Sequence, residues 1–294
     1  MTVTAKVICD SQYGPQRLIT LEINLHRFIL PEFNTHRTFS RNFQSSRAVP
    51  VEKIIDQVRL NPATPIHWGK NQPGMIADEE TNVGVAYEWD YDEVYYPLPP
   101  TLAWYSAAAE AANIAEAFQK AGYHKQIINR LLEPFMWTRG LVTATKEAYD
   151  AFFDLRIHAA AQPEIKALAE KMLEAITESN PKQLQMGEWH LPYVSERDCL
   201  PLETAIKVSI SCCAQVSYRK LDTSVEKAKK VYDMLNLPIG GTYPTDPPHF
   251  SPAEHVARAS ELLTLDKEYS GNFNTQYFIQ YRKLLENGKE QAFV

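Results

Sequence analysis

The sequence predicts an α+β fold that is mainly helical, with a small antiparallel or mixed sheet. Two segments near the N-terminus, residues 3–9 and 18–25, carry β-branched and aliphatic residues in partial alternation, which is typical of strands. After residue 100, apolar residues recur mostly at helical spacing. Strands and helices do not alternate along the chain as they would in a doubly wound parallel sheet. We therefore expect a helical protein with one small sheet.

The first hundred residues are expected to hold both strands, one helix and a long irregular segment. A turn at residues 11–16 joins the strands. Val51–Leu60 is expected to be a helix because its apolar residues have helical spacing. Asn61–Pro100 has weak periodicity and contains the acidic, tyrosine-rich run YEWDYDEVYYP. Forty such residues are too many for an ordinary connection, so residues 51–100 are interpreted as a region carrying a functional loop or an insertion.

Helices are expected to dominate the rest of the chain. The clearest is Pro163–Thr177, where a proline opens the first turn and apolar residues form one stripe. Helical patterns also cover Thr101–Ala121, Lys125–Leu132, Thr145–Ile157, Leu202–Tyr218, Ser224–Leu235, Pro252–Leu263 and Gln276–Glu286.

Composition narrows the class of protein. Hydrophobic residues make up 45% and charged residues 22% of the 294, which excludes a disordered chain. Thirty Lys and Arg against thirty-six Asp and Glu give a net charge of −6, which argues against binding along a nucleic-acid polymer. No apolar run reaches membrane-spanning length, and the first residues lack the features of a signal peptide. We expect a cytoplasmic protein with no membrane partner.

The four cysteines indicate neither a metal site nor a disulfide framework. Cys9, Cys199, Cys212 and Cys213 show no CxxC spacing. Cys212 and Cys213 lie in an apolar helical pattern, and none of the four is in an electropositive setting that would activate a thiol. We therefore expect no metal ligands and no catalytic cysteine.

Residues 35–47, THRTFSRNFQSSR, combine three arginines with three serines. Guanidinium and hydroxyl groups are the donors that bind phosphate oxygens. The alternative is a solvated loop whose Ser and Asn side chains cap the helix at Val51–Leu60. The chain has no GxxxxGK[ST] and no GxGxxG after a strand, which excludes a P-loop and a dinucleotide-binding fold.

This segment resembles the signature of the flavin-dependent thymidylate synthases, which reads Arg-His-Arg, seven residues, Ser, one residue, Arg. The corresponding residues here are His36, Arg37, Ser45 and Arg47, with Asn42 inside the motif. Thr35 stands in place of the first arginine of the signature, and Phe43 in place of its acidic residue.

Two further blocks resemble the same family. Arg130-Leu-Leu-Glu-Pro134 is similar to its Arg-x-x-x-Pro, and FFDLR (152–156) followed by AQPEI (161–165) is similar to its "FLxLR…AQxEI". Near the C-terminus, AQVSY (214–218) and HFSPAEH (249–255) resemble the segment with which family members begin. We therefore expect one domain over residues 1–294 that is a circular permutation, with residues 203–262 replacing the N-terminal module. Termini that lie close together on a surface make such a permutation tolerable.

The resemblance implies an enzyme that methylates deoxyuridine monophosphate at C5 and assembles as a homotetramer with shared active sites. It implies FAD as cofactor, methylenetetrahydrofolate as carbon donor and NADPH as reductant. Arg156 and Ser45 are the candidate catalytic residues, with Arg156 polarising the base. The candidate substrate-binding residues are Glu32, Ser45, Ser46, Arg47, Arg130 and Arg156. The candidate cofactor-binding residues are His36, Arg37, Asn42, Ser217, His249, Ser251, Glu254 and Arg282.

Three questions stay open at this stage. A related flavoenzyme could act on another pyrimidine nucleotide, as a deoxycytidylate methylase or hydroxymethylase, because Phe43 and the insertion alter what lines the base pocket. A non-catalytic homologue could bind nucleotide without flavin. Arg282 could replace the charge missing at Thr35, or could lie in the last turns of a terminal helix, where it would interact with the helix dipole.

Overall fold

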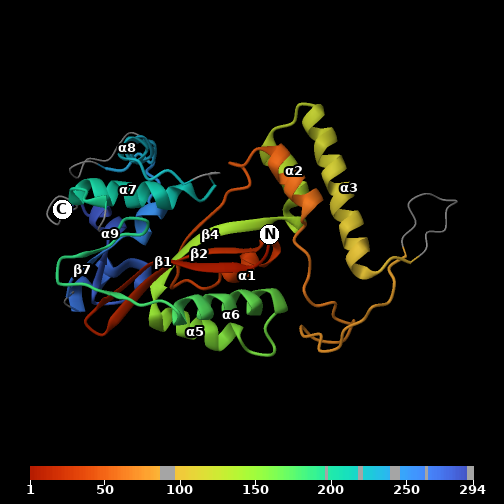
Figure 1. Cartoon of the computed structure of the whole chain (residues 1–294), viewed down its shortest axis with the longest axis horizontal. Coiled ribbons are helices and arrows are strands. Elements are labelled where there is room, and N and C mark those ends of the chain that lie inside the picture. Colours follow the sequence, from red (N-terminus) through yellow and green to blue (C-terminus); the bar gives the residue numbers. More distant parts are fainter. Residues whose placement is uncertain (87–96, 196–197, 218–220, 239–245, 262–263, 290–294) are drawn as a thin grey trace.

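A five-stranded mixed sheet forms the centre of the computed structural model, which describes residues 1–86, 97–195, 198–217, 221–238, 246–261 and 264–289. Its order is β3-β4-β2-β1-β5 (Figure 1). The strands are β1 (Thr4–Tyr13), β2 (Gln16–His26), β3 (Ser40–Phe43), β4 (Trp137–Thr145) and β5 (Lys182–Gln183). β5 runs parallel to β1, and the other neighbours are antiparallel. The predicted fold class is confirmed, although the sheet is larger than expected.

The β1–β2 hairpin turns within Gly14 and Pro15, so both strands are longer than predicted. Gly14 has φ +54°, a conformation in which glycine has no steric penalty. β4 was not predicted, yet its position between β2 and β3 makes it the strand that links the hairpin to the arginine-rich segment.

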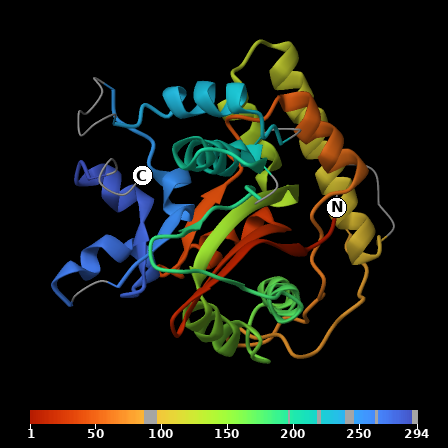
Figure 2. The same cartoon turned by 60° about the vertical axis from the view of Figure 1, so that its left-hand side comes forward.

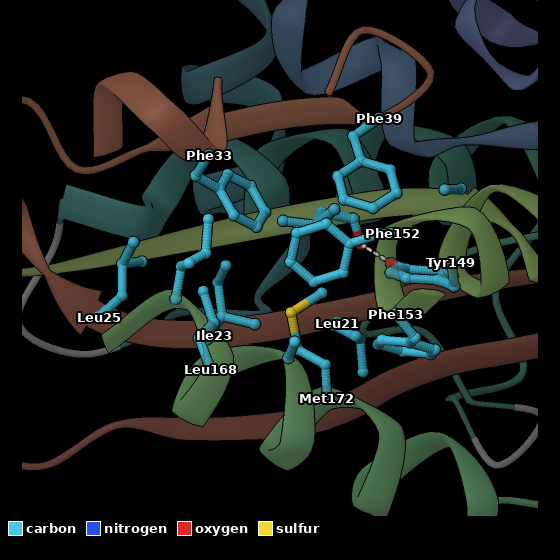
Figure 3. Packing of buried hydrophobic residues seen from close by; sticks show 14 of the residues in the cluster. Leu21, Ile23, Leu25, Phe33, Phe39, Tyr149, Phe152, Phe153, Leu168 and Met172 are labelled. Carbon is cyan, nitrogen blue, oxygen red and sulfur yellow. Dashed lines mark hydrogen bonds between the residues drawn. The ribbon is translucent and has the colours of Figure 1, made fainter. Parts of the chain in front are cut away.

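Two helices cover one face of this sheet, α5 (Lys146–Arg156) and α6 (Pro163–Thr177) (Figure 2). Their apolar stripes meet Ile19, Leu21 and Ile23 of β2 in the main hydrophobic core. Phe152 packs among Phe33, Phe39 and Tyr149, as Figure 3 shows. The Tyr149 hydroxyl donates to the Val142 carbonyl at 3.0 Å, which satisfies the buried phenol.

The C-terminal part of the chain covers the opposite face. It contains α7 (Leu202–Ala214), α8 (Val225–Met234), α9 (Tyr281–Glu286) and a second, antiparallel sheet in the order β6-β7-β8. These strands are β6 (Trp189–His190), β7 (Ala257–Ala259) and β8 (Phe278–Gln280). Leu141 of β4 packs against Cys213 and Val216, which joins this layer to the central sheet.

A third layer of helices stands beside the sheet (Figure 1). It consists of α2 (Val51–Leu60), α3 (Pro100–Lys120) and α4 (Lys125–Leu132), which share a separate apolar cluster. The short α1 (Leu30–Phe33) follows β2 after a 3-10 turn at Arg27–Ile29. Among the described residues, no helix is long and apolar enough to span a membrane.

Two predicted C-terminal helices are corrected by the structure. Pro252–Leu263 is instead a 3-10 helix at Ser251–His255 followed by β7, because residues 257–259 pair with β6 and β8 on either side. Residues 262–263 lie outside the described part. Gln276–Glu286 divides into β8 and α9, since only its second half is free of strand pairing.

The other boundaries are close to prediction. The helix predicted to Tyr218 ends at Ala214 and continues as a 3-10 turn to Ser217. Residues 61–86 and 97–99 contain isolated bridges such as Val85↔Leu98 but no regular element, as predicted. Residues 87–96, most of the tyrosine-rich run, lie outside the described part.

Candidate active site

The loop that carries the arginine-rich motif is anchored at both ends by buried aromatic rings. Phe33 ends α1 and Phe39 precedes β3, and both are at most 1% exposed. Figure 3 shows both rings next to Phe152. His36 lies between them with its ring edge-on to Phe152, at a centroid distance of 4.7 Å. The hydrophobic core therefore fixes where this loop presents its polar side chains.

Arg156, at the end of α5, joins this loop to Glu32 of α1. Its Nε–H donates to His36 Nε2 at 3.0 Å, and its Nη1 forms an ion pair with the Glu32 carboxylate. Because Nε2 of His36 accepts, the imidazole is neutral with its proton on Nδ1. Burial is the main cause that lowers the pKa of His36 to about 4, and the charges of Arg156 and Arg41 contribute to this shift. The structure thus brings together three of the predicted site residues in one hydrogen-bonded group.

Arg41 occupies the region that lacks the first arginine of the signature. Its guanidinium donates to the carbonyl oxygens of Asn34, at 3.0 Å, and of His36, so it binds the backbone on both sides of Thr35. Burial lowers the pKa of Arg41, and the nearby Glu254 carboxylate partly offsets this effect. Sequence reasoning assigned Arg41 no role, although it is one of the three arginines in the motif.

A second polar cluster converges on Glu133, which follows α4. Glu133 accepts from Arg130 Nη1 at 3.1 Å, from Ser46 Oγ at 3.1 Å and from Arg27 Nη2 at 3.5 Å. The buried Asn129 donates to the Ser46 carbonyl at 2.6 Å, which holds this part of the loop against α4. Ser46 and Arg130 were predicted to share a site, whereas Arg27 and Glu133 were not recognised.

A cavity of about 680 Å³ lies beside these groups. It is lined by Arg27, Arg130 and Glu133 on one side and by Asn34, Leu30 and Pro31 of the motif loop and α1 on the other. A larger cavity of about 920 Å³ shares Phe28 and Pro134 with it and is walled by residues 65–78 and the α5–α6 loop. The charged residues of that larger cavity are mainly acidic, so the smaller, arginine-lined cavity fits an anion better.

Two predicted arginines are available at the surface. Arg37 and Arg47 are exposed, and neither has an ion-pair partner in the part of the chain that the structure describes. Ser45, next to Ser46, is partly buried. Exposed guanidinium groups of this kind are donors suited to phosphate oxygens.

The C-terminal segment reaches the same strands from the opposite face of the sheet. Asn42 Nδ2 donates to the Cys213 carbonyl at 2.7 Å, and Gln280 Nε2 bridges Ser40 Oγ at 3.0 Å and the Glu254 carbonyl at 2.9 Å. The structure therefore brings β3, which carries Asn42, close to the segment that carries Glu254.

The remaining predicted residues are less closely engaged. His249 and Ser251 are exposed near Glu254, and Ser217 ends a 3-10 helix with its side chain outside the described residues.

Arg282 is the residue that was hypothesised to replace the charge missing at Thr35. It forms ion pairs with Glu254 and Glu286 and lies over the Phe250 ring at 5.4 Å. Arg282 is also in the first turn of α9, so the alternative that placed it in the last turns is wrong. The reason for this error is β8, which shortens the helix at its N-terminal end.

Three of the four cysteines are not activated as nucleophiles. Burial raises the pKa of Cys9 to about 11 and that of Cys212 to about 12, and it raises the pKa of Cys213 as well. These thiols are protonated at neutral pH. Among the described residues, no group of three or more His, Cys, Asp or Glu side chains is placed to hold a metal ion.

Comparison with protein families matches residues 16–182, more than half of the chain, to the thymidylate synthase complementing protein (Thy1). The chain belongs to this family. The matched range contains the motif loop, Arg130 and Arg156, and it ends before the C-terminal layer. A comparison with curated proteins found no significant match.

Solved structures with similarity include Thy1-related enzymes at low identity. The UMP/dUMP methylase PolB from Streptomyces cacaoi bound with 5-Br dUMP is 20% identical, with 55% of this chain and 66% of that chain covered and a TM-score of 0.36. The same methylase bound with 5-Br UMP is 16% identical, with 60% and 89% covered and a TM-score of 0.41. Thymidylate synthase X from Helicobacter pylori with FAD and dUMP is 16% identical, with 54% and 67% covered and a TM-score of 0.36. The chain thus covers just under two thirds of the first of these proteins.

Proposed function

We propose that this Thy1-family protein methylates C5 of deoxyuridine monophosphate, with FAD as cofactor, methylenetetrahydrofolate as carbon donor and NADPH as reductant. The observation that carries the proposal is the arginine-lined cavity beside the Glu32–Arg156–His36 group, formed by residues within the family match. The similar solved structures are described with 5-Br dUMP, 5-Br UMP, dUMP and FAD, which supports this substrate class.

The phosphate of the substrate is assigned to Ser45, Ser46, Arg47 and Arg130. Their hydroxyl and guanidinium groups form charge-assisted hydrogen bonds to phosphate oxygens. The base is assigned to Arg156, with Glu32 beside it. Because the Glu32 carboxylate and His36 Nε2 hold the guanidinium from two directions, Arg156 is oriented before substrate binds. A fixed positive charge can then polarise the pyrimidine without reorganising, and this is the catalytic role we assign to Arg156.

The residues that we assign to FAD include donors suited to its phosphates. Arg37 is exposed without an ion-pair partner among the described residues, and the Arg41 guanidinium lies beside the same loop. When bound, FAD supplies the electrons of the reaction. The other assigned residues are His36, Asn42, Ser217, His249, Ser251, Glu254 and Arg282. Asn42 and Glu254 engage neighbouring groups of the protein, so their role is to position the loop and its charges.

We also propose that residues 203–262 are the permuted N-terminal module of a single domain. The contacts of Cys213 with Asn42 and of His255 with Thr143 place this segment directly against β3 and β4. A homotetramer with shared sites accompanies this proposal. Large apolar side chains exposed on α3 and α4, including Ile114, Ile127 and Leu131, support it.

Phe43 does not favour a different base. Its ring packs edge-on against Phe33 at 5.6 Å and lies over Gly140, so it faces the core. A cytidine nucleotide and a flavin-free, non-catalytic protein are therefore outcomes of the test below and not separate proposals.

The test begins with the spectrum of the purified protein with and without added FAD. Flavin absorbance should elute with the protein, and a protein that retains no FAD would be the non-catalytic homologue. Calorimetric titration with deoxyuridine monophosphate follows. Arg47→Ala and Arg130→Ala should each weaken binding about ten- to a hundredfold, the loss expected for one charge-assisted contact.

Arg59→Ala is the matched control, because Arg59 pairs with Glu116 on α3 and should leave the affinity unchanged. Unchanged affinity in both site variants would refute the phosphate assignment. Tighter binding of deoxycytidine monophosphate would move the assignment to the cytidine nucleotide.

A further inference from the structure

Glu133 is the one acidic side chain among the described residues that line the arginine-bearing cavity. It is the first residue of the 3-10 helix Glu133–Phe135, directly after α4. Both oxygens of its carboxylate accept from Arg130 Nη1, Oε1 at 3.1 Å and Oε2 at 3.3 Å. It also accepts from Ser46 at 3.1 Å and from Arg27 at 3.5 Å.

These donors are the ones a phosphate would need. Carboxylate and phosphate oxygens both accept from guanidinium and hydroxyl groups, in similar geometry. With Glu133 in place, Ser46 and Arg130 are already occupied. A phosphomonoester carries a charge of about −1.5 to −2 at pH 7, so it would also be repelled by a carboxylate in the same cluster.

Charge and exposure show what would happen on binding. Arg27 and Arg130 contribute two positive charges and Glu133 one negative charge, so the cluster has a net charge of +1 in this state. Releasing Glu133 raises the charge facing the ligand to +2, which matches a phosphate dianion. The Glu133 side chain is 24% exposed, so it has access to solvent when the donors release it.

We propose that Glu133 is an internal competitor for the phosphate-binding donors, displaced when a phosphomonoester enters. It is a positioning and specificity residue, because it holds Arg27, Arg130 and Ser46 in place until a ligand arrives. It also sets a threshold for that ligand. Weakly binding monoanions do not displace it, whereas a phosphate dianion does. The inference rests on the proposed function only for the identity of the nucleotide. The competition between Glu133 and a phosphate group does not depend on it.

The experiment compares the full-length parent with Glu133→Gln, which keeps the shape and removes the charge. Inorganic phosphate, deoxyuridine monophosphate and deoxyuridine are titrated by calorimetry. Glu133→Gln should bind both phosphate-containing ligands at least about tenfold more tightly, while deoxyuridine affinity stays the same. If Glu133 only held Arg27, Arg130 and Ser46 in place, Glu133→Gln would bind the phosphate-containing ligands more weakly than the parent, because the donors would be less ordered.

Two further variants keep the result interpretable. Glu116→Gln is the matched control, because Glu116 also pairs with two cations, Arg59 and Lys120, away from this cavity. It should behave as the parent. Glu133→Ala frees the same donors and should shift phosphate affinity in the same direction, so it replaces Glu133→Gln if that variant does not fold.

The outcomes separate this inference from the proposed function. If no variant binds the nucleotide but Glu133→Gln binds inorganic phosphate more tightly than the parent, the proposed substrate is wrong and the competitor role stands. If the parent binds the nucleotide and neither Glu133 variant binds phosphate more tightly, the competitor role is overturned and the proposed function stands.

Discussion

Two buried histidines should make this protein acid-labile. His190 and His255 are both fully buried. The hydroxyl groups of Thr20 and Thr143, which pair on the neighbouring strands β2 and β4, link the two imidazoles. His190 Nε2 contacts Thr20 Oγ1 at 2.8 Å, Thr20 contacts Thr143 at 2.7 Å, and Thr143 contacts His255 Nδ1 at 2.8 Å. Burial is the main cause that lowers the pKa of each histidine from 6.5 to about 3.

The direction of the effect follows from proton binding. Between pH 6.5 and 3 the unfolded chain binds protons at these histidines and the folded protein does not, so stability falls as the pH decreases through this range. pH 5 lies about 1.5 units below the unfolded pKa of 6.5. Each histidine that stays neutral in the folded protein therefore lowers the free energy of unfolding at pH 5 by about 2 kcal/mol. His190 and His255 together should lower the free energy of unfolding by about 4 kcal/mol between pH 7 and pH 5. His36 and His26, whose pKa values are also lowered by burial, add to the loss.

Urea unfolding at pH 7 and pH 5 measures this loss. His190→Gln should be less stable than the parent at pH 7 but should lose about 2 kcal/mol less on acidification. His158→Gln is the control, since His158 is exposed, and its pH dependence should equal that of the parent. A parent that loses less than about 1 kcal/mol, or a His190→Gln variant that loses as much as the parent, would refute the assignment of neutral buried histidines.

Two further predictions concern the core and the motif loop. Phe152→Ala should lower the free energy of unfolding, measured in urea, by about 3–5 kcal/mol because the ring is fully buried. Leu155→Ala, on the exposed side of α5, should cost far less. Equal losses in the two variants would contradict the packing of Phe152. Arg41→Ala should weaken FAD retention at least about tenfold and more than Arg282→Ala does, since Arg41 lies beside Thr35 and Arg282 is paired with Glu254. If fluorescence titration shows a larger loss of FAD affinity in Arg282→Ala than in Arg41→Ala, Arg282 would be the residue that compensates for Thr35.

Helices with one strongly apolar stripe were predictable to the residue. α2, α4 and α6 have the boundaries that the sequence indicated, because periodicity and a terminal proline or polar residue agree in each. Residues 252–263 and 276–286 were misassigned because their short strands are stabilised only by pairing with each other and with β6. Such pairing joins segments about twenty residues or more apart, and local periodicity carries no information about it.

The candidate site also contains residues that the sequence could reveal and residues that only the fold reveals. His36, Ser46, Arg130 and Arg156 could be found from the sequence because they stand in motifs of fixed spacing. Arg27, Arg41 and Glu133 could not, since their importance comes from what they contact in the fold. Glu133 lies within the Arg130–Pro134 motif, but only the structure shows that its carboxylate meets Ser46 from a distant segment.

The buried polar contacts between the two halves of the chain bear on how the site is built. Ser40 with Gln280, Asn42 with Cys213 and Thr143 with His255 each join the family-matched region to the C-terminal layer. A buried polar group left without a partner costs about 1–3 kcal/mol, so β3 and β4 depend on that layer. β3 lies between the loop of His36 and Arg37 on one side and Ser45 and Ser46 on the other. The geometry of both polar clusters is therefore a property of the whole chain, which explains how a motif with an altered first residue can still be held in place.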